Sequence, residues 1–177
     1  MSVVRAVCAA VALVWVSGAV AFAAQPGRRS IDAGSEVAKG HYVNVRYGYS
    51  VNFPTGLLVA EPESDAGDGR AFHARRGSAK AAVWGAWKLD DLDQRPSTIA
   101  AEAEQECGGP AAYKVVKPTM AAVSCVTKKG DVLYRKTLLK GDQIVSLQMT
   151  YPAAERATWD PVLQRVAASL TILEPAR

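Results

Sequence analysis

The segment from Val43 to Phe53 carries an apolar or aromatic side chain at every second position, and this alternation constrains the fold more than any other feature. A period of two residues puts these side chains on one face of an extended chain, as in a half-buried β-strand. Gly48 permits a bend or bulge, so two short strands are an alternative to one long strand. Pro54 has no amide hydrogen to donate and ends the run. The predicted buried face comprises Val43, Val45, Tyr47, Tyr49, Val51 and Phe53.

Three further strands are predicted over residues 57–62, 70–74 and 80–87. The last of these, KAAVWGAW, is apolar at both parities, which is typical of a strand that is covered on both faces. Trp84 and Trp87 are therefore expected to fill the core on opposite sides of the sheet. If either tryptophan were exposed, it would instead be an anchor for a partner protein or a sugar ring.

Two helices are predicted, one before and one after a second group of strands in the sequence. The first covers residues 97–109, with Ser97 as its cap, a buried stripe that ends at Cys107, and a glycine stop. The second has Asp160 as its cap and Pro161 in its first turn. Its apolar side is formed, at helical spacing, by Trp159, Val162, Leu163, Val166 and Leu170.

Residues 112–151 between the helices predict a meander, because β-branched runs alternate with turns that contain glycine followed by aspartate. The buried parity of its final strand is Val145, Leu147, Met149 and Tyr151. The order is thus strands, helix, three strands and helix. This order predicts an α+β protein, in which an antiparallel sheet is flanked by helices.

The N-terminal segment 1–23 predicts a signal peptide, since Arg5 precedes a long apolar run and Ala21-Phe22-Ala23 fits the small-x-small cleavage rule. An uncleaved membrane anchor is the alternative, because the run is about long enough to span a bilayer. Cleavage would leave about 154 residues with a net charge of +3. We divide them into a flexible lead-in (24–40), a single domain (41–173) and a tail (174–177).

Cleavage of this segment implies a periplasmic or secreted protein without stable membrane insertion. The basic residues of the mature protein are spread along the chain rather than clustered, which argues against nucleic acid as a partner. Two cysteines remain after cleavage, Cys107 and Cys125, and an even pair in an oxidising compartment predicts a structural disulfide. Two free buried thiols are the alternative. A redox-active pair would normally have Cys-x-x-Cys spacing.

No residue of the sequence is identified as catalytic, cofactor-binding or metal-binding. The sequence has neither a Gly-x-Ser-x-Gly elbow nor Ser-x-x-Lys. His41 and His73 are far apart and lack nearby cysteine or histidine ligands. The acidic loop Glu61–Asp68 could offer oxygens to calcium, but it lacks the glycine and closing glutamate of a calcium loop, so a solvated turn is favoured. Catalysis by two carboxylates that are paired only in space is an alternative, because such pairs are not visible in a sequence.

The stretch YGYSVNFP, from Tyr47 to Pro54, resembles the start of PsbP-like domains. The PES…GDGR.F pattern in Pro62–Phe72 and the YRKT stretch in Tyr134–Thr137 resemble stretches of small exported bacterial proteins of unknown function, a subset to which the chain is more similar still. The resemblance covers His41–Leu173. It implies an αβα sandwich that acts by binding other proteins or by supporting an assembly, and no functional residue can be carried over from it.

Two classes of function follow. The first is an exported, non-enzymatic binding or accessory protein of the cell envelope, which acts through a protein partner of unknown identity. The second is a hydrolase that uses spatially paired carboxylates, for which a pocket with acidic residues would be the sign. A carrier of a small apolar ligand between sheet and helix is a further alternative.

Overall fold

The computed structural model describes residues 37 and 39–174. The predicted signal peptide (1–23), most of the lead-in and residues 175–177 lie outside the described residues. The chain forms strands and helices in the following order: β1 (His41–Asn44), β2 (Tyr49–Asn52), β3 (Leu58–Glu63), β4 (Gly69–Ala74), β5 (Lys80–Trp87), α2 (Pro96–Cys107), β6 (Tyr113–Lys117), β7 (Met120–Val126), β8 (Asp131–Lys140), β9 (Gln143–Pro152), a 3-10 turn (Ala153–Glu155), α3 (Arg156–Ser169) and β10 (Thr171–Ile172).

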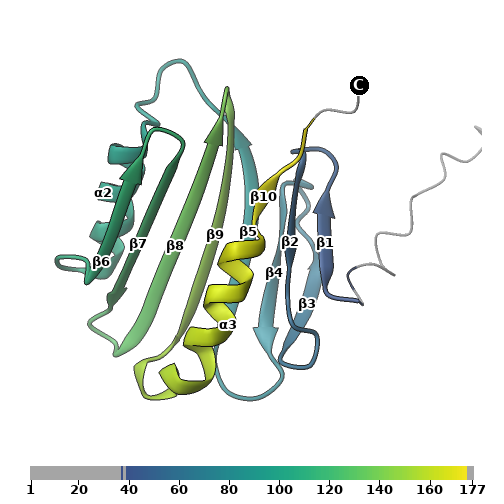
Figure 1. The fold of residues 1–177 in the computed structure, drawn as a ribbon, viewed down its shortest axis with the longest axis vertical. Coiled ribbons are helices and arrows are strands. Elements are labelled where there is room, and N and C mark those ends of the chain that lie inside the picture. The colour runs from purple at the N-terminus through teal and green to yellow at the C-terminus, as the bar shows by residue number, and fades with distance from the viewer. Residues whose placement is uncertain (1–36, 38, 175–177) are drawn as a thin grey trace, which may run out of the picture. The chain divides into compact units, whose positions relative to one another are not determined.

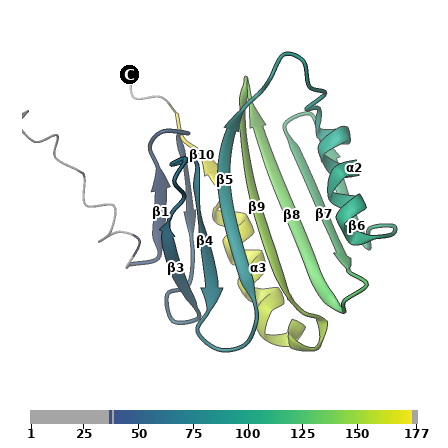
Figure 2. The same cartoon turned by 180° about the vertical axis from the view of Figure 1, so that it is seen from behind.

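The main sheet is antiparallel and has the strand order β3-β4-β5-β9-β8-β7-β6. A smaller sheet has the order β1-β2-β10. Helix α3 lies in front of the main sheet in Figure 1, together with the small sheet, whereas α2 lies behind it; the view from behind in Figure 2 reverses this order. The arrangement is the predicted α+β class, an antiparallel sheet with helices on both faces. The meander contains four strands, β6 to β9, rather than the three that we expected.

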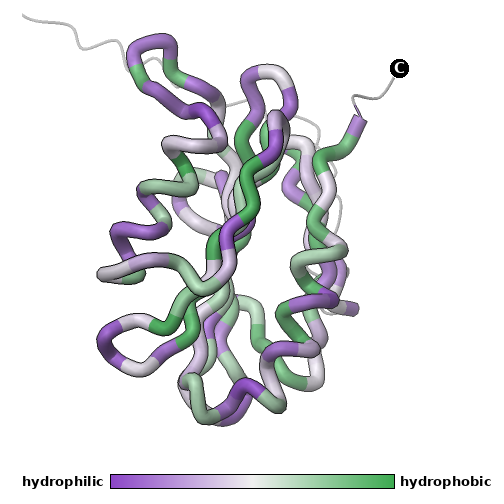
Figure 3. The backbone as a smooth tube through the Cα atoms, turned by 60° about the vertical axis from the view of Figure 1, so that its left-hand side comes forward, coloured by the Kyte–Doolittle hydropathy of each residue, from purple (hydrophilic) through white to green (hydrophobic). Residues whose placement is uncertain are grey.

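The larger core lies between the main sheet and the layer that contains α3, β1 and β2. Its fully buried side chains include Tyr49, Val51, Val83, Leu147, Met149 and Val162. In Figure 3 the hydrophobic stretches are concentrated in the strands and in α3, while the turns are more hydrophilic. The predicted buried parity of β9 is confirmed, because Val145, Leu147, Met149 and Tyr151 are all buried.

The alternating run that opens the domain forms two short strands, which was the predicted alternative to one long strand. The prediction that its apolar residues share a single buried face was wrong. Residues 45–48 form a turn, which leaves Val45 77% exposed. The antiparallel pairing of β1 with β2 then buries Tyr42 and Asn44 rather than Val43. The expected Tyr49, Val51 and Phe53, in β2 and directly after it, are buried, and Ser50 of β2 is buried as well. The turn shifts the phase of the alternation, which a strict two-residue period cannot show.

Helix α2 packs on the opposite face of the sheet, over β7 and its neighbours. It begins at Pro96 and not at Ser97, and its N-cap residue Arg95 makes no side-chain capping bond. Proline is well suited to the first position, because its missing amide hydrogen would have no helical partner there. Gly108, with φ of 70°, ends the helix as predicted.

Helix α3 begins at Arg156, so the prediction of Asp160 as its cap was wrong. The 3-10 turn Ala153–Glu155 runs directly into the helix and supplies an extra turn before Pro161. Pro161 consequently lies inside the helix. The five apolar residues expected on one side of this helical region, Trp159, Val162, Leu163, Val166 and Leu170, are all buried.

The expectation that both Trp84 and Trp87 are core residues was wrong for Trp87, which is 52% exposed. Trp84 is half-buried. The α3 face of β5 is covered, since Ala81 and Val83 are buried, but Ala82 on the other face is only half-buried. Trp84 and Ala82 are half-buried because α2 covers the β6–β8 part of their face and leaves β5 uncovered (Figure 2). Trp87 lies on the same face as Ala81 and Val83, but it is the last residue of β5, where its ring meets Tyr47 of the 45–48 turn.

Candidate functional site

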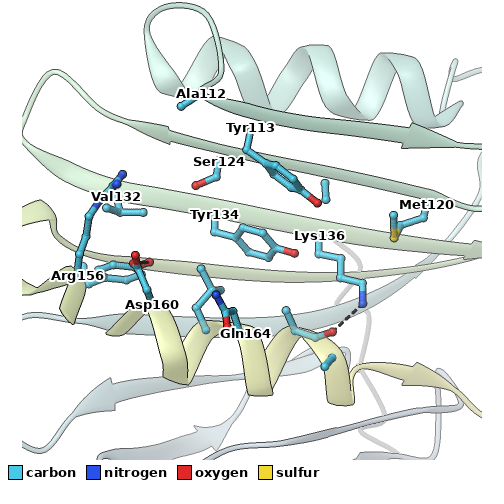
Figure 4. A pocket seen from close by; sticks show the side chains of 15 residues that line it. Ala112, Tyr113, Met120, Ser124, Val132, Tyr134, Lys136, Arg156, Asp160 and Gln164 are labelled. Carbon is cyan, nitrogen blue, oxygen red and sulfur yellow. Dashed lines mark hydrogen bonds between the residues drawn. The ribbon is translucent and has the colours of Figure 1, made fainter. Parts of the chain in front are cut away.

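A groove of about 590 Å³ lies between α3 and strands β6 to β8. Figure 4 shows the side chains that line it, with strands on one side and α3 on the other. We call it the tyrosine groove. The strands contribute Tyr113, Met120, Ala122, Ser124, Val132, Tyr134, Lys136 and Tyr151, and the preceding loop contributes Ala112. Helix α3 contributes Arg156, Asp160, Leu163, Gln164, Ala167 and Ala168.

The floor of the tyrosine groove has a row of hydroxyl groups that crosses three strands. The sheet register places Tyr113 opposite Ser124, and Ser124 opposite Tyr134, so the three side chains lie on the same face. Tyr113 is half exposed at the outer edge, and Tyr134 lies further in (Figure 4). Burial, and secondarily the neighbouring Tyr113, raises the pKa of Tyr134 to about 12. Its hydroxyl therefore stays neutral at physiological pH and can donate a hydrogen bond.

The helical wall presents Arg156, Asp160 and Gln164, which are spaced four residues apart and therefore share one side of α3. Asp160 Oδ1 accepts a hydrogen bond of 2.7 Å from the Tyr151 hydroxyl. Burial, and then this hydrogen bond, raises the pKa of Tyr151 well above its ordinary value. Asp160 is thus engaged by the protein itself, whereas Gln164 is an exposed side chain on the groove wall.

Lys136 lies at the end of the tyrosine groove nearest the C-terminus of α3 (Figure 4). Its Nζ donates a 2.7 Å hydrogen bond to the carbonyl oxygen of Ala167. Carbonyl groups in the last turn of a helix lack helical partners, and a cation there also complements the helix dipole. Burial lowers the pKa of Lys136. Lys136 therefore joins β8 to α3 and fixes the width of the groove at this end.

The chemistry that this groove offers is binding by apolar contact and by neutral hydrogen-bonding groups. Asp160 is the single carboxylate among its lining residues, so the groove does not bring together the two carboxylates that the hydrolase hypothesis requires. Sequence reasoning did not identify the groove. The available signal was the polar parity of β8, where Tyr134 and Lys136 share a face with apolar Val132 and Leu138.

The structure joins Cys107 at the end of α2 to Cys125 in β7 by a disulfide, with Cα atoms 5.9 Å apart. Both cysteines are buried in the small core beneath α2. The bond ties the helix to the sheet at the place where the predicted buried stripe of the helix meets β7.

The acidic loop spreads its carboxylates over different partners. Glu61 contacts Nδ1 of His73, and Glu63 accepts hydrogen bonds from Arg70 (3.1 Å) and from the Tyr42 hydroxyl. Asp68 accepts a hydrogen bond from the hydroxyl of Ser64. Within residues 37 and 39–174, no group of three or more histidine, cysteine or acidic side chains is arranged to hold a metal ion. His41 contacts Asn52 at the surface, 2.6 Å between Nδ1 and Oδ1.

A second surface feature is an exposed apolar cluster at the end of the molecule where β5 leaves the sheet. The ring centroids of Trp87 and Tyr47 are 5.8 Å apart. The guanidinium group of Arg46 lies over the Tyr47 ring. In the following loop Leu89 and Leu92 are each more than half exposed. This cluster is the place of the exposed tryptophan that the sequence analysis treated as a potential partner anchor.

The chain is similar in structure to solved proteins, one of them cyanobacterial. The solution structure of cyanobacterial PsbP (CyanoP) from Synechocystis sp. PCC 6803 superposes with a TM-score of 0.56 over 75% of this chain and 91% of that chain, at 10% identity. The fold is PsbP-like. No family model and no curated protein matches the sequence. At this identity the similarity shows the architecture of the chain and no activity.

Of the described helices, none is long and apolar enough to cross a membrane.

Proposed function

We propose that the protein is an exported, non-enzymatic binding or accessory protein of the cell envelope, and that a protein partner occupies the tyrosine groove. The observation that carries this proposal is the groove itself. Its floor combines Tyr113 and Tyr134 with apolar side chains, and tyrosine contributes large contact areas to protein interfaces at a low entropic cost. The neutral hydroxyls would give the contact direction without the desolvation cost of buried charges.

Export is supported by the signal-peptide pattern in residues 1–23 and by the disulfide. Disulfides persist in oxidising compartments, which include the periplasm and the extracellular space. Cell fractionation followed by N-terminal sequencing tests this part of the proposal. A mature N-terminus near Ala24 in the envelope or secreted fraction is the expected result, and a chain that starts at Met1 in the cytoplasm would contradict it.

The partner is tested by affinity capture from the envelope fraction with two matched variants. Gln164→Trp fills the tyrosine groove from an exposed position of α3, so the fold should tolerate it. Arg165→Trp places the same side chain on the next residue, which is also exposed but does not line the groove. We expect the wild type and Arg165→Trp to retain one stoichiometric protein that Gln164→Trp loses. Equal capture by all three, or by none, would contradict the proposal.

A small-ligand carrier is a second candidate, because the groove volume falls within the range of about 300–1,000 Å³ that is typical of ligand pockets. Native mass spectrometry of protein purified from its own envelope distinguishes the two. A constant added mass below about 1 kDa that Gln164→Trp abolishes would favour the carrier over the protein partner.

A further inference from the structure

Strand β6 (Tyr113–Lys117) is an open edge of the main sheet and borders the tyrosine groove. It pairs only with β7, and the described part of the chain places no strand along its outer side. Its five residues include neither a proline nor a register shift, and Pro110 and Pro118 lie outside it. A regular edge strand of this kind presents backbone donors and acceptors with which another strand can pair.

The opposite edge of the sheet is protected in a way that β6 is not. Strand β3 contains Pro62, and its pairing with β4 is irregular between Ala60 and Glu63. Proline and bulges both interrupt a ladder and discourage strand addition. The two edges therefore differ, and β6 is the edge that is suited to accept a strand.

Charge selects what can pair with β6. A second copy of the chain, paired antiparallel about Val115 and Val116, would set Lys114 of one copy opposite Lys117 of the other. Like charges directly opposite each other destabilise a pair of strands. Basic side chains outnumber acidic ones around this edge and the groove. The cations are Lys114, Lys117, Lys136 and Arg156, and the anions are Glu104 and Asp160. One of the cations, Lys114, is neutralised by its 2.6 Å ion pair with Glu104. The surplus favours an acidic partner.

The side chains of β6 indicate the rest of the partner's composition. Tyr113 is 50% exposed on the groove face, and Val116 is 44% exposed on the other face. Aromatic and β-branched residues on an added strand would cover both side chains through cross-strand contacts. On the groove face, such residues would extend the floor that Tyr113 and Tyr134 already form.

From these observations we propose that the partner binds as an extended acidic segment, which adds a strand to β6 and places an apolar or aromatic side chain beside Tyr113 at the mouth of the tyrosine groove. This inference rests on the proposed function and names the mode of binding. Main-chain hydrogen bonds would supply affinity, and the groove would supply specificity.

The test uses the mature protein and a capped, labelled octapeptide in which glutamate alternates with valine and tyrosine. Two further peptides carry N-methyl groups on alternate amides, one on the odd and one on the even positions. Strand addition uses the amides along one side of the peptide only. We therefore expect one methylated peptide to bind as the parent does and the other to lose binding. The same sequence with lysine in place of glutamate should not bind.

Two protein measurements complete the test. Because side chains alternate along a strand, a peptide with its aromatic residues beside Tyr113 directs its glutamates to the face of β6 that carries Lys114. Lys114→Glu should therefore weaken binding of the parent peptide by about fivefold, whereas the matched change Lys88→Glu, in the loop after β5, should not. Amide hydrogen exchange of residues 113–117 should slow at saturating peptide. Equal binding of both methylated peptides, unchanged exchange in β6, or no saturable binding up to about 1 mM would each overturn strand addition.

The outcome is separable from the test of the proposed function. If envelope capture depends on Gln164 but the peptide fails these tests, the groove remains a partner site and strand addition to β6 is wrong. If the peptide binds as expected but no envelope protein is captured, the mode of binding stands and the proposed physiological partner does not.

Discussion

Lys136 of β8 donates a hydrogen bond of 2.7 Å to the carbonyl oxygen of Ala167 in the last turn of α3. These two residues are 31 positions apart in the sequence, and their contact closes one end of the tyrosine groove. We expect Lys136→Met to lower the free energy of unfolding by about 1–2 kcal/mol, because a charge-assisted bond and a favourable dipole interaction are both lost. Urea unfolding measures the change. Lys129→Met, at the exposed β7–β8 turn, is the control, and an equal effect of the two substitutions would contradict this role.

Removal of the disulfide should destabilise the domain, because the unfolded chain then gains conformational entropy. The bond joins residues 18 positions apart, and the chain-entropy model gives about 3 kcal/mol for a loop of this length. The double variant Cys107→Ala/Cys125→Ala should therefore unfold at a lower urea concentration than the wild type, and reductant should affect only the wild type. Two titratable thiols in the unreduced, denatured mature protein would show that the bond is absent.

Buried tyrosines predict a loss of stability at alkaline pH. Burial raises the pKa of Tyr42 and of Tyr134 to about 12, from the ordinary value of 10. The folded state therefore holds these protons more tightly, so the stability from each group is full below pH 10 and falls, by up to about 3 kcal/mol, as the pH rises to 12. The pKa values of Tyr49 and Tyr151 are raised as well, mainly by burial. The lowered pKa of Lys136 acts in the opposite direction, but it is one group against four.

Unfolding measured at a series of pH values between 9 and 12 tests this dependence. Tyr134→Phe removes one of the tyrosines with a raised pKa and keeps the ring, so its stability should fall less steeply above pH 10 than that of the wild type. Identical slopes for the variant and the wild type would contradict the assigned burial of the Tyr134 hydroxyl.

The exposed tryptophan gives a spectroscopic prediction. Trp87 is half exposed, whereas Trp159 is buried in the core beside Tyr151. Trp87→Phe should therefore shift the fluorescence maximum of the mature protein to shorter wavelength, and Trp159→Phe should shift it to longer wavelength. No shift in Trp87→Phe would mean that this side chain is buried, as the two-sided apolar pattern of β5 had suggested.

Local sequence patterns predicted the strands, both helices and the α+β class, because side-chain period and helix stop signals are properties of neighbouring residues. Errors arose where a neighbouring turn changed the phase or the start of an element. The turn 45–48 reversed the buried parity of β1, and the 3-10 turn before Arg156 displaced the start of α3. Strand β10 has two residues and pairs with β2, so nothing in its own sequence identifies it.

The candidate site was much less predictable than the fold. The tyrosine groove combines Tyr113, Tyr134 and Gln164, which the sheet register and the placement of α3 bring together across some 50 residues of sequence. The uncovered face of β5 was missed for a similar reason, since the position of α2 over β6–β8 depends on packing between distant elements. Such information lies in tertiary contacts and not in periodicity.

The central claim, that a protein partner occupies the tyrosine groove, is tested most directly by photo-crosslinking in intact cells. A photoreactive phenylalanine analogue is placed at position 164, which lines the groove, or at position 165, the adjacent exposed position outside it. The account predicts one dominant adduct from position 164 and none of that mass from position 165. The same adduct from both positions, or no adduct from position 164, would contradict it.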